Sequence, residues 1–164
     1  MKISLALREP IAPDYEALAT WITDANACTR WAGPLLPFPF SVNALPRLLQ
    51  APGATSHSMS QDGEDFLGFG QFWPRDHDAV HLGRVIVAPQ ARGQGLGKTL
   101  CLLLAKAALN ATQANMVTLK VYRDNPAAMN TYTSLGFVAV AEESEDVVIF
   151  MRSTAQMLRE KNFQ

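Results

Sequence analysis

The sequence predicts one mixed α/β domain over residues 1–164, and three observations support this prediction. The chain has 164 residues and is 48% hydrophobic, which suits one compact domain with its own core. Stretches with the alternation of strands are interspersed with stretches of helical spacing. No internal repeat, low-complexity tract or linker divides the chain. We therefore expect a core over residues 2–153, followed by a polar C-terminal tail over residues 154–164.

The first elements are a strand and two helices. Residues 3–9 alternate as an opening strand, and residues 14–22 carry apolar side chains at helical spacing after Pro13. Residues 32–40 contain three prolines, so they form an ordered apolar loop rather than a helix or a central strand. Ser41 is then the expected cap of a second, short helix.

The rest of the chain alternates strands with two further helices. In chain order we expect a hairpin of residues 54–60 and 66–73 around Asp62-Gly63, a strand at 79–88, a helix at 96–109, a strand at 116–122, a helix at 125–135 that Gly136 ends, and two strands at 137–143 and 146–152. The order βααβββαβαββ describes a sheet of about seven strands flanked by four helices.

Composition narrows the function. The net charge of −1 gives no electrostatic reason to expect a nucleic-acid partner. Two cysteines, Cys28 and Cys101, lack the spacing of a metal site or a disulfide framework, so no metal is expected. The first ten residues do not resemble a signal peptide, and no window is long enough for a membrane span. The expected location is the cytoplasm, away from the membrane.

The stretch VIVAPQARGQGLGKTL, residues 85–100, indicates a phosphate site. A strand that runs into a helix through a glycine-rich turn leaves the first helical N–H groups unpaired, and these groups bind anions. Gly93, Gly95 and Gly97 allow an anion to approach the backbone closely, and Arg92 adds a charged donor. A P-loop requires its first glycine at position 92, where this chain has arginine, and the dinucleotide fingerprint also fails.

The pattern that fits is R-x-x-G-x-G, from Arg92 to Gly97. A second block, VYRDNPAAMNTYTSLGF, carries Asn125, Tyr132 and the triplet at 135–137. With these two blocks at this separation, the sequence resembles the GNAT superfamily of acetyl-CoA-dependent N-acetyltransferases, near its protein N-terminal and spermidine acetyltransferase branch. The resemblance implies a GNAT-like fold with a mostly antiparallel, twisted central sheet. It also implies acetyl-CoA as co-substrate, and it leaves a homodimer open.

The resemblance also implies which residues hold coenzyme A. The backbone of residues 92–98 would bind the pyrophosphate, and two strand residues would pair with the pantetheine arm as an added strand does. The residues so placed are Ile86, Val87, Arg92, Gly93, Gln94, Gly95, Leu96, Gly97, Lys98 and Asn125. Two of them have an alternative: Asn125 can serve as a helix N-cap, and Lys98 as a solvated helix residue.

Acetyl transfer needs a neutral amine and a proton for the departing thiolate. By resemblance Tyr132 is the general acid, and its alternative role is a buried aromatic anchor. His81 stands six residues before Val87, where histone-type members of the family carry a glutamate base, and it is our candidate base. The alternatives are an exposed hairpin histidine and a water chain. Lys120 occupies the strand in which other members carry a glutamate, so that base is absent.

In the family, the acceptor pocket lies between the loop that joins the first two helices, here residues 30–40, and the last hairpin. Trp31 and Phe38 would line it, and Glu142 and Glu143 at the hairpin tip would favour a cationic amine. Their alternatives are core filling and a solvated turn. The leading hypothesis is direct attack of a primary amine, on a small molecule or a peptide, in a ternary complex with acetyl-CoA. The rival hypotheses are a non-catalytic acyl-CoA sensor or regulatory module and a nucleotide-binding P-loop domain.

Overall fold

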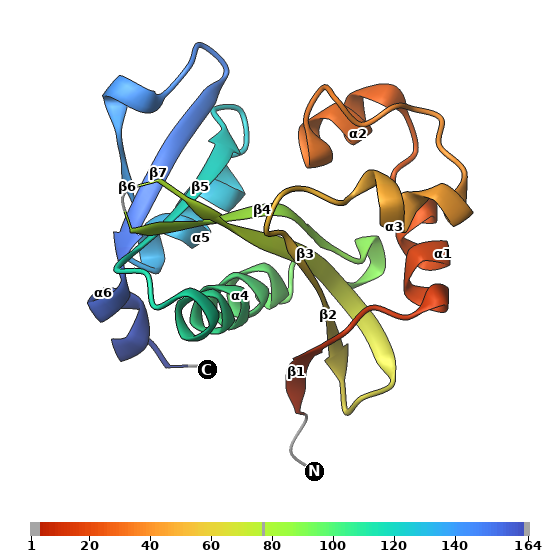
Figure 1. Ribbon diagram of the computed structural model, residues 1–164, viewed down its shortest axis with the longest axis horizontal. Coiled ribbons are helices and arrows are strands. Elements are labelled where there is room, and N and C mark those ends of the chain that lie inside the picture. Colours follow the sequence, from red (N-terminus) through yellow and green to blue (C-terminus); the bar gives the residue numbers. More distant parts are fainter. Residues whose placement is uncertain (1–3, 77, 163–164) are drawn as a thin grey trace.

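The computed structural model describes residues 4–76 and 78–162, which form one sheet covered by helices on both faces (Figure 1). The strands are β1 (Leu5–Arg8), β2 (Thr55–Gln61), β3 (Asp65–Arg75), β4 (Ala79–Val87), β5 (Met116–Tyr122), β6 (Val138–Ala139) and β7 (Val148–Thr154). The helices are α1 (Ala12–Trp21), α2 (Ala25–Ala32), α3 (Leu45–Leu48), α4 (Leu96–Thr112), α5 (Pro126–Ser134) and α6 (Ala155–Glu160). The predicted fold class, a mixed α/β domain with a seven-stranded sheet, is confirmed.

The sheet has the order β1-β2-β3-β4-β5-β7-β6, and its neighbours are antiparallel except for β4 and β5. These two central strands run parallel and pair over a short stretch that ends at His81↔Thr118. Beyond this pair the strands separate, although β4 continues to Val87 and β5 to Tyr122. The edge of β4 that faces β5 is therefore without a strand partner over residues 82–87.

Two hydrophobic clusters pack on the two sides of the sheet. The larger one gathers α4 and α6 against the central strands around fully buried residues such as Leu100, Leu104 and Leu158. The smaller one gathers α1, α2 and α3 over Phe69 of β3. In Figure 1 the three N-terminal helices stand together on the right, away from α4. The domain therefore consists of a sheet and its α4 layer, with a separate helical cap over part of the other face.

Two helices differ from the prediction, which had four in place of six. The α2 helix was not expected; the carboxylate of Asp24 caps it by accepting from the Ala27 amide. The prediction of a polar tail over 154–164 was wrong for the first part of that segment, because α6 forms there. Thr154 caps this helix, which buries Ala155 and Leu158. These two apolar side chains are three residues apart and lie on one face of the helix. The segment is polar on average, so two buried residues were too few to predict a helix from the sequence.

The last predicted hairpin is also shorter than expected. β6 covers Val138–Ala139 alone, and residues 141–143 form a 3-10 turn instead of continuing the strand. The hydroxyl of Ser144 bonds both the Val140 carbonyl and the Phe150 amide, which fixes this turn against β7.

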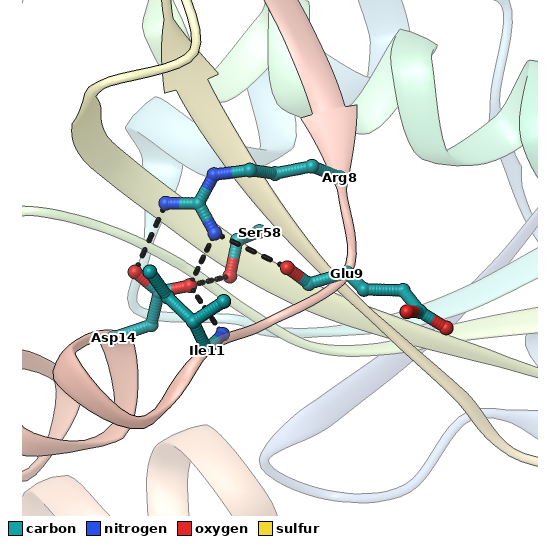
Figure 2. A network of polar contacts seen from close by, with 5 residues as sticks. All are labelled: Arg8, Glu9, Ile11, Asp14 and Ser58. Atoms are coloured by element: carbon teal, nitrogen blue, oxygen red, sulfur yellow. Dashed lines mark hydrogen bonds and ion pairs between the residues drawn. The ribbon is translucent and has the colours of Figure 1, made fainter.

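A buried carboxylate attaches α1 to the sheet (Figure 2). Both oxygens of Asp14 accept hydrogen bonds from the Arg8 guanidinium, at 2.6 and 3.0 Å. Ser58 of β2 and the amide of Ile11 donate to the same side chain at 2.8 and 3.0 Å. One carboxylate therefore connects β1, β2 and the first turn of α1, and it places the helical cap relative to the sheet.

Candidate active site

The glycine-rich turn leaves its backbone open to solvent. Gly93 and Gly95 have φ angles of 80° and 79°, in the left-handed region that favours glycine. A Cβ atom added to either residue, or to Gly97, would meet no atom within 4 Å. Gly95 is the N-cap of α4, and no side chain caps this end. The first N–H groups of α4 are thus directed at open space, as an anion site requires.

A cavity of about 440 Å³ lies between this turn, the end of β4 and α5. It brings together all the residues predicted to hold coenzyme A except Gln94: Ile86, Val87, Arg92, Gly93, Gly95, Leu96, Gly97, Lys98 and Asn125. Gln94 lines a neighbouring cavity on the outer side of the α4 N-terminus. Nine of the ten residues predicted to hold coenzyme A thus line one cavity, and their role stays a prediction.

The residues of this cavity fit the chemistry of coenzyme A. Arg92 and Lys98 supply positive charge beside uncapped helical amides, which suits a pyrophosphate. Ile86 and Val87 lie on the stretch of β4 that has no partner on the β5 side, which suits an extended arm. Arg92 Nε donates to the Val87 carbonyl at 3.1 Å. The Asn125 side chain accepts from the Ala128 amide at 3.2 Å, so it serves at least as the N-cap of α5.

A second, smaller cavity of about 130 Å³ fills the gap between the diverging strands. It shares Val85, Asn125 and Tyr132 with the first cavity. Tyr132 packs edge-on against Phe137, and burial, with Cys101 nearby, raises the pKa of its hydroxyl above the ordinary value. Burial also raises the pKa of the Cys101 thiol to about 12. Tyr132 is therefore a protonated donor at the gap, and Cys101 is an unreactive core thiol.

A third cavity of about 600 Å³ opens on the other side of the gap and shares residues 82–84 and 120–122 of β4 and β5 with the second. We call it the acceptor cavity. Its wall also includes α2 and the loop after it, Trp73 of β3, and three residues before and at the start of β7, Glu145, Val147 and Val148. The Trp31 indole donates to the Arg84 carbonyl at 2.8 Å, which holds α2 against β4. The three cavities adjoin one another through shared lining residues, from the glycine turn to the helical cap, and Tyr132 lines the first two.

A β-bulge in β4 shapes these cavities. Between Phe69↔Ile86 and Gln71↔Gly83, β3 advances by two residues and β4 by three. Arg84 takes up the extra residue with a φ of 51°, an uncommon conformation for a side chain of this size. Its guanidinium donates to Gln71 Oε1 at 2.7 Å and to the Leu49 carbonyl at 3.0 Å. Gly83 and Arg84 were missed from the sequence, where a glycine inside a strand was the available signal.

His81 lines the acceptor cavity and is 7% exposed. Its Nδ1 lies 2.7 Å from the Thr118 hydroxyl, and its ring lies between those of Trp73 and Phe150. Burial, together with the positive charges of Arg75 and Lys120, lowers the pKa of His81 to about 4. The imidazole is therefore neutral at pH 7 and a weak base.

The other predicted acceptor residues are not brought together. Trp31 lines the acceptor cavity, whereas Phe38, Glu142 and Glu143 are absent from its lining. Phe38 is 36% exposed and packs on Phe40, and Glu143 lies 3.6 Å from Arg75 in an ion pair. Glu142 and Glu143, which were expected to favour a cationic acceptor, thus lie outside the cavity, and Glu145 is the carboxylate of the hairpin tip that lines it.

Residues 4–76 and 78–162 contain no cluster of three or more His, Cys, Asp or Glu side chains placed to hold a metal ion. Within the same ranges, no helix combines the length and the apolar character of a membrane span.

The chain belongs to the acetyltransferase (GNAT) family, which it matches over residues 21–137. An N-acetyltransferase 9-like protein from Nematostella vectensis is 26% identical over 79% of this chain and 58% of its own length. A mycothiol acetyltransferase from Mycolicibacterium smegmatis is 42% identical over 52% of this chain and 30% of its own length. The chain thus spans between 30% and 58% of the length of these relatives.

Solved structures share the fold over nearly the whole chain. A spermidine N-acetyltransferase from Vibrio cholerae in complex with CoA and spermine superposes with a TM-score of 0.77 at 18% identity, covering 95% of this chain and 98% of the other. An aminoglycoside acetyltransferase in complex with coenzyme A and kanamycin gives a TM-score of 0.72 at 18% identity, covering 96% and 99%.

Proposed function

We propose that this chain is an acetyl-CoA-dependent N-acetyltransferase that transfers an acetyl group to a primary amine by direct attack in a ternary complex. The observation that carries the proposal is the row of adjoining cavities that runs from the glycine turn to the acceptor cavity, with the gap between β4 and β5 at its middle. Two molecules that enter from opposite ends would meet beside Tyr132. Membership of the GNAT family and the coenzyme A complexes of the structural neighbours support this reading.

In the proposal, residues 92–98 bind the pyrophosphate of the co-substrate with their backbone amides, and Arg92 and Lys98 neutralise its charge. Ile86 and Val87 hold the pantetheine arm along the unpaired edge of β4, which directs it to the gap. Acetyl-CoA supplies the activated thioester. The chain itself contributes orientation and the exclusion of water, which lower the barrier by fixing the two reactants in position.

Tyr132 is the proposed general acid. Burial keeps its hydroxyl protonated at neutral pH, so the hydroxyl is ready to donate to the sulfur as the C–S bond breaks. A thiol has a pKa of about 8.5 and regains its proton readily at neutral pH. As the C–S bond breaks, the hydroxyl proton moves to the sulfur, and Tyr132 regains a proton from water, which receives the proton that the amine loses.

His81 is the candidate base, and its low pKa limits what it can do. A neutral imidazole accepts a hydrogen bond from the amine or from a water molecule, but a base with a pKa near 4 passes the proton on rather than keeping it. In this proposal the amine reaches the gap as the neutral species, and its proton leaves through water past His81.

Thermal stabilisation by acetyl-CoA, free CoA and ATP, measured side by side, tests the binding half of the proposal. At a hundredfold excess over the dissociation constant, a specific ligand stabilises a protein by about 2.7 kcal/mol. We expect this gain with acetyl-CoA and with CoA and none with ATP. A gain with ATP alone would overturn the proposal.

Turnover by the Tyr132→Phe variant tests the catalytic half. We expect acetyl-CoA to stabilise the variant as it does the wild type, and kcat to fall by about a hundredfold because the proton donor is lost. Unchanged kcat would remove Tyr132 from the mechanism. Binding of acetyl-CoA without transfer to any amine would instead support a non-catalytic acyl-CoA sensor.

A further inference from the structure

Positively charged side chains outnumber carboxylates around the acceptor cavity. Arg30, Arg84 and Lys120 line it, and Glu145 is the one carboxylate among the described residues of its wall. Arg75 is close enough to contribute to the low pKa of His81. The wall of the acceptor cavity therefore carries an excess of positive charge and two tryptophan side chains, Trp31 and Trp73.

The cations differ in how far internal partners satisfy them. Arg30 forms an ion pair with Asp124 at 2.8 Å and lies 4.3 Å from the centre of the Tyr122 ring. The guanidinium of Arg84 donates hydrogen bonds to Gln71 and to the Leu49 carbonyl, so some of its N–H groups already have partners. Within residues 4–76 and 78–162, Lys120 makes neither an ion pair nor a hydrogen bond. Lys120 is thus the cation of the cavity wall that is available to a ligand.

Lys120 also lies where a substrate must pass. It borders both the gap cavity and the acceptor cavity, as do Trp31 and Tyr122. It lines the acceptor cavity together with His81 and lies two residues after Thr118, the partner of His81 on β5. A ligand whose amine reaches the gap will therefore have its adjacent atoms beside Lys120. An anionic group there gains a charge-assisted hydrogen bond, and a second cationic group is repelled.

We propose that the acceptor is a primary amine that also carries an anionic group, a carboxylate or a phosphate, and that Lys120 binds this group. This inference rests on the proposed function. It differs from the expectation drawn from Glu142 and Glu143, because those carboxylates lie outside the cavity and Glu143 already pairs with Arg75. The aromatic rings of Trp31 and Trp73 then hold the apolar part of the acceptor, and the cations select its charge.

Matched amines test the proposal with the wild-type protein. The pairs are phosphoethanolamine with ethanolamine, and glycine and β-alanine with their uncharged amides, with spermidine added as a polycation. Transfer is followed by the release of free thiol at low ionic strength. We expect kcat/KM for the anionic member of at least one pair to exceed that of its partner by about tenfold, and this preference to shrink as salt is added. The phosphate and carboxylate arms show which anion is bound.

Two charge reversals complete the experiment. Lys120→Glu is expected to remove the preference for the anionic amine, whereas Arg159→Glu, the same reversal on α6 in the opposite layer, is expected to keep it. Stabilisation by acetyl-CoA is measured for each variant, and it shows that the fold and the co-substrate site are intact. Lys120→Met gives a second, uncharged variant in which the preference should also disappear.

The possible outcomes separate the inference from the function on which it rests. Faster transfer to the neutral amines or to spermidine would overturn the inference and support the acetyltransferase function. A preference that survives in Lys120→Glu would also overturn it. Failure of acetyl-CoA to stabilise the wild type would overturn the function. In that case, calorimetry would measure binding of the anionic amines directly. Binding to the wild type that is lost in Lys120→Glu would still support the ligand class. No binding to the wild type would overturn it.

Discussion

Substituting Gly83 by alanine should reshape the acceptor cavity without touching the coenzyme site. The indole of Trp73 lies over the Cα atom of Gly83. A Cβ atom added there would lie 2.2 Å from Trp73 Cη2 and 2.9 Å from Cζ3. The φ angle of Gly83 is outside the left-handed region, so alanine is acceptable to the backbone and the contact with the ring is the source of any effect.

The size of the effect follows from these distances. The ring must retreat from 2.2 Å to ordinary van der Waals contact, which begins at 3.4 Å, a movement of about 1.2 Å. Trp73 and Gly83 both line the acceptor cavity, so the displaced ring moves within its wall. Overpacking of this kind costs about 1–3 kcal/mol of stability. The glycine turn lies at the far end of β4, and its cavity lacks both residues.

We expect Gly83→Ala to unfold at lower temperature, to bind acetyl-CoA as the wild type does, and to show a KM for the amine acceptor raised by about tenfold. Differential scanning fluorimetry with and without acetyl-CoA measures the first two quantities, and steady-state kinetics the third. Gly97→Ala is the control for stability, because a Cβ atom there meets open space and alanine favours the helix. Its unfolding temperature should stay the same or rise.

Removal of the ring tests the cause. In the double variant Gly83→Ala/Trp73→Ala, the clash is absent, so the alanine at position 83 should cost less stability than it does beside the indole. Additive losses of stability in this cycle would refute the explanation, because they would show that Gly83 acts independently of Trp73. An unchanged acceptor KM in Gly83→Ala would refute the assignment of this cavity to the acceptor.

Four further predictions concern the binding turn, the candidate base and the framework. Gly95→Ala should reduce stabilisation by acetyl-CoA and cost about 1–2 kcal/mol of stability, because its φ of 79° suits glycine; an unchanged denaturation midpoint would contradict this. His81→Ala should lower kcat by about tenfold, and the wild-type pH profile should lack a limb near pH 6.5, since the pKa of His81 is about 4; a limb at 6.5 that this variant removes would contradict the burial argument. Asp14→Asn should cost about 3 kcal/mol in urea denaturation at pH 7. Burial alone would raise the pKa of Asp14, but the hydrogen bonds from Arg8, Ile11 and Ser58 outweigh it and lower the pKa. The stability advantage of the wild type over this variant therefore persists above the ordinary pKa of 3.8 and shrinks as the pH falls below it. Leu158→Ala should cost about 2–5 kcal/mol, which calorimetry would detect, whereas a frayed tail would lose nothing.

Elements set by local chemistry were predictable from the sequence. The strand at 116–122 has the bounds that its pattern indicated, and Asp62 and Gly63 both take positive φ angles, as a tight hairpin turn requires. Asn125 caps α5 as expected. Most residues predicted to hold coenzyme A lie on a strand, a turn and a helix N-terminus that follow one another in sequence, so they are close in space; Asn125 reaches the same cavity from α5, where the fold places it.

Features that depend on distant pairing were not predictable. The bulge at Arg84 arises from the register between β3 and β4, and its guanidinium is held by Gln71 and Leu49. The α2 helix is short, and its stability comes from contacts of Cys28 and Trp31 with the smaller hydrophobic cluster. Glu142 and Glu143 lie outside the acceptor cavity because the chain turns at 141–143 before it reaches the wall. Contacts between residues that are distant in the sequence cannot be predicted from local sequence patterns.

The division of the cavities between separate parts of the chain implies that the two substrates can be altered independently. The cavity proposed for coenzyme A is built from the end of β4, the glycine turn, α4 and α5, all after residue 84. The acceptor cavity takes α2, the loop after it, Trp73 and residues 81–84 from the first half of the chain, and residues 120–122 with Glu145, Val147 and Val148 from the second half. Asp14 attaches α1, and with it the helical cap, to β1 and β2 alone, away from the glycine turn. Loosening that attachment should therefore raise the acceptor KM while acetyl-CoA binding is retained. Weakened acetyl-CoA binding in Asp14→Asn, under conditions where the variant is folded, would show that the cap and the coenzyme site are coupled.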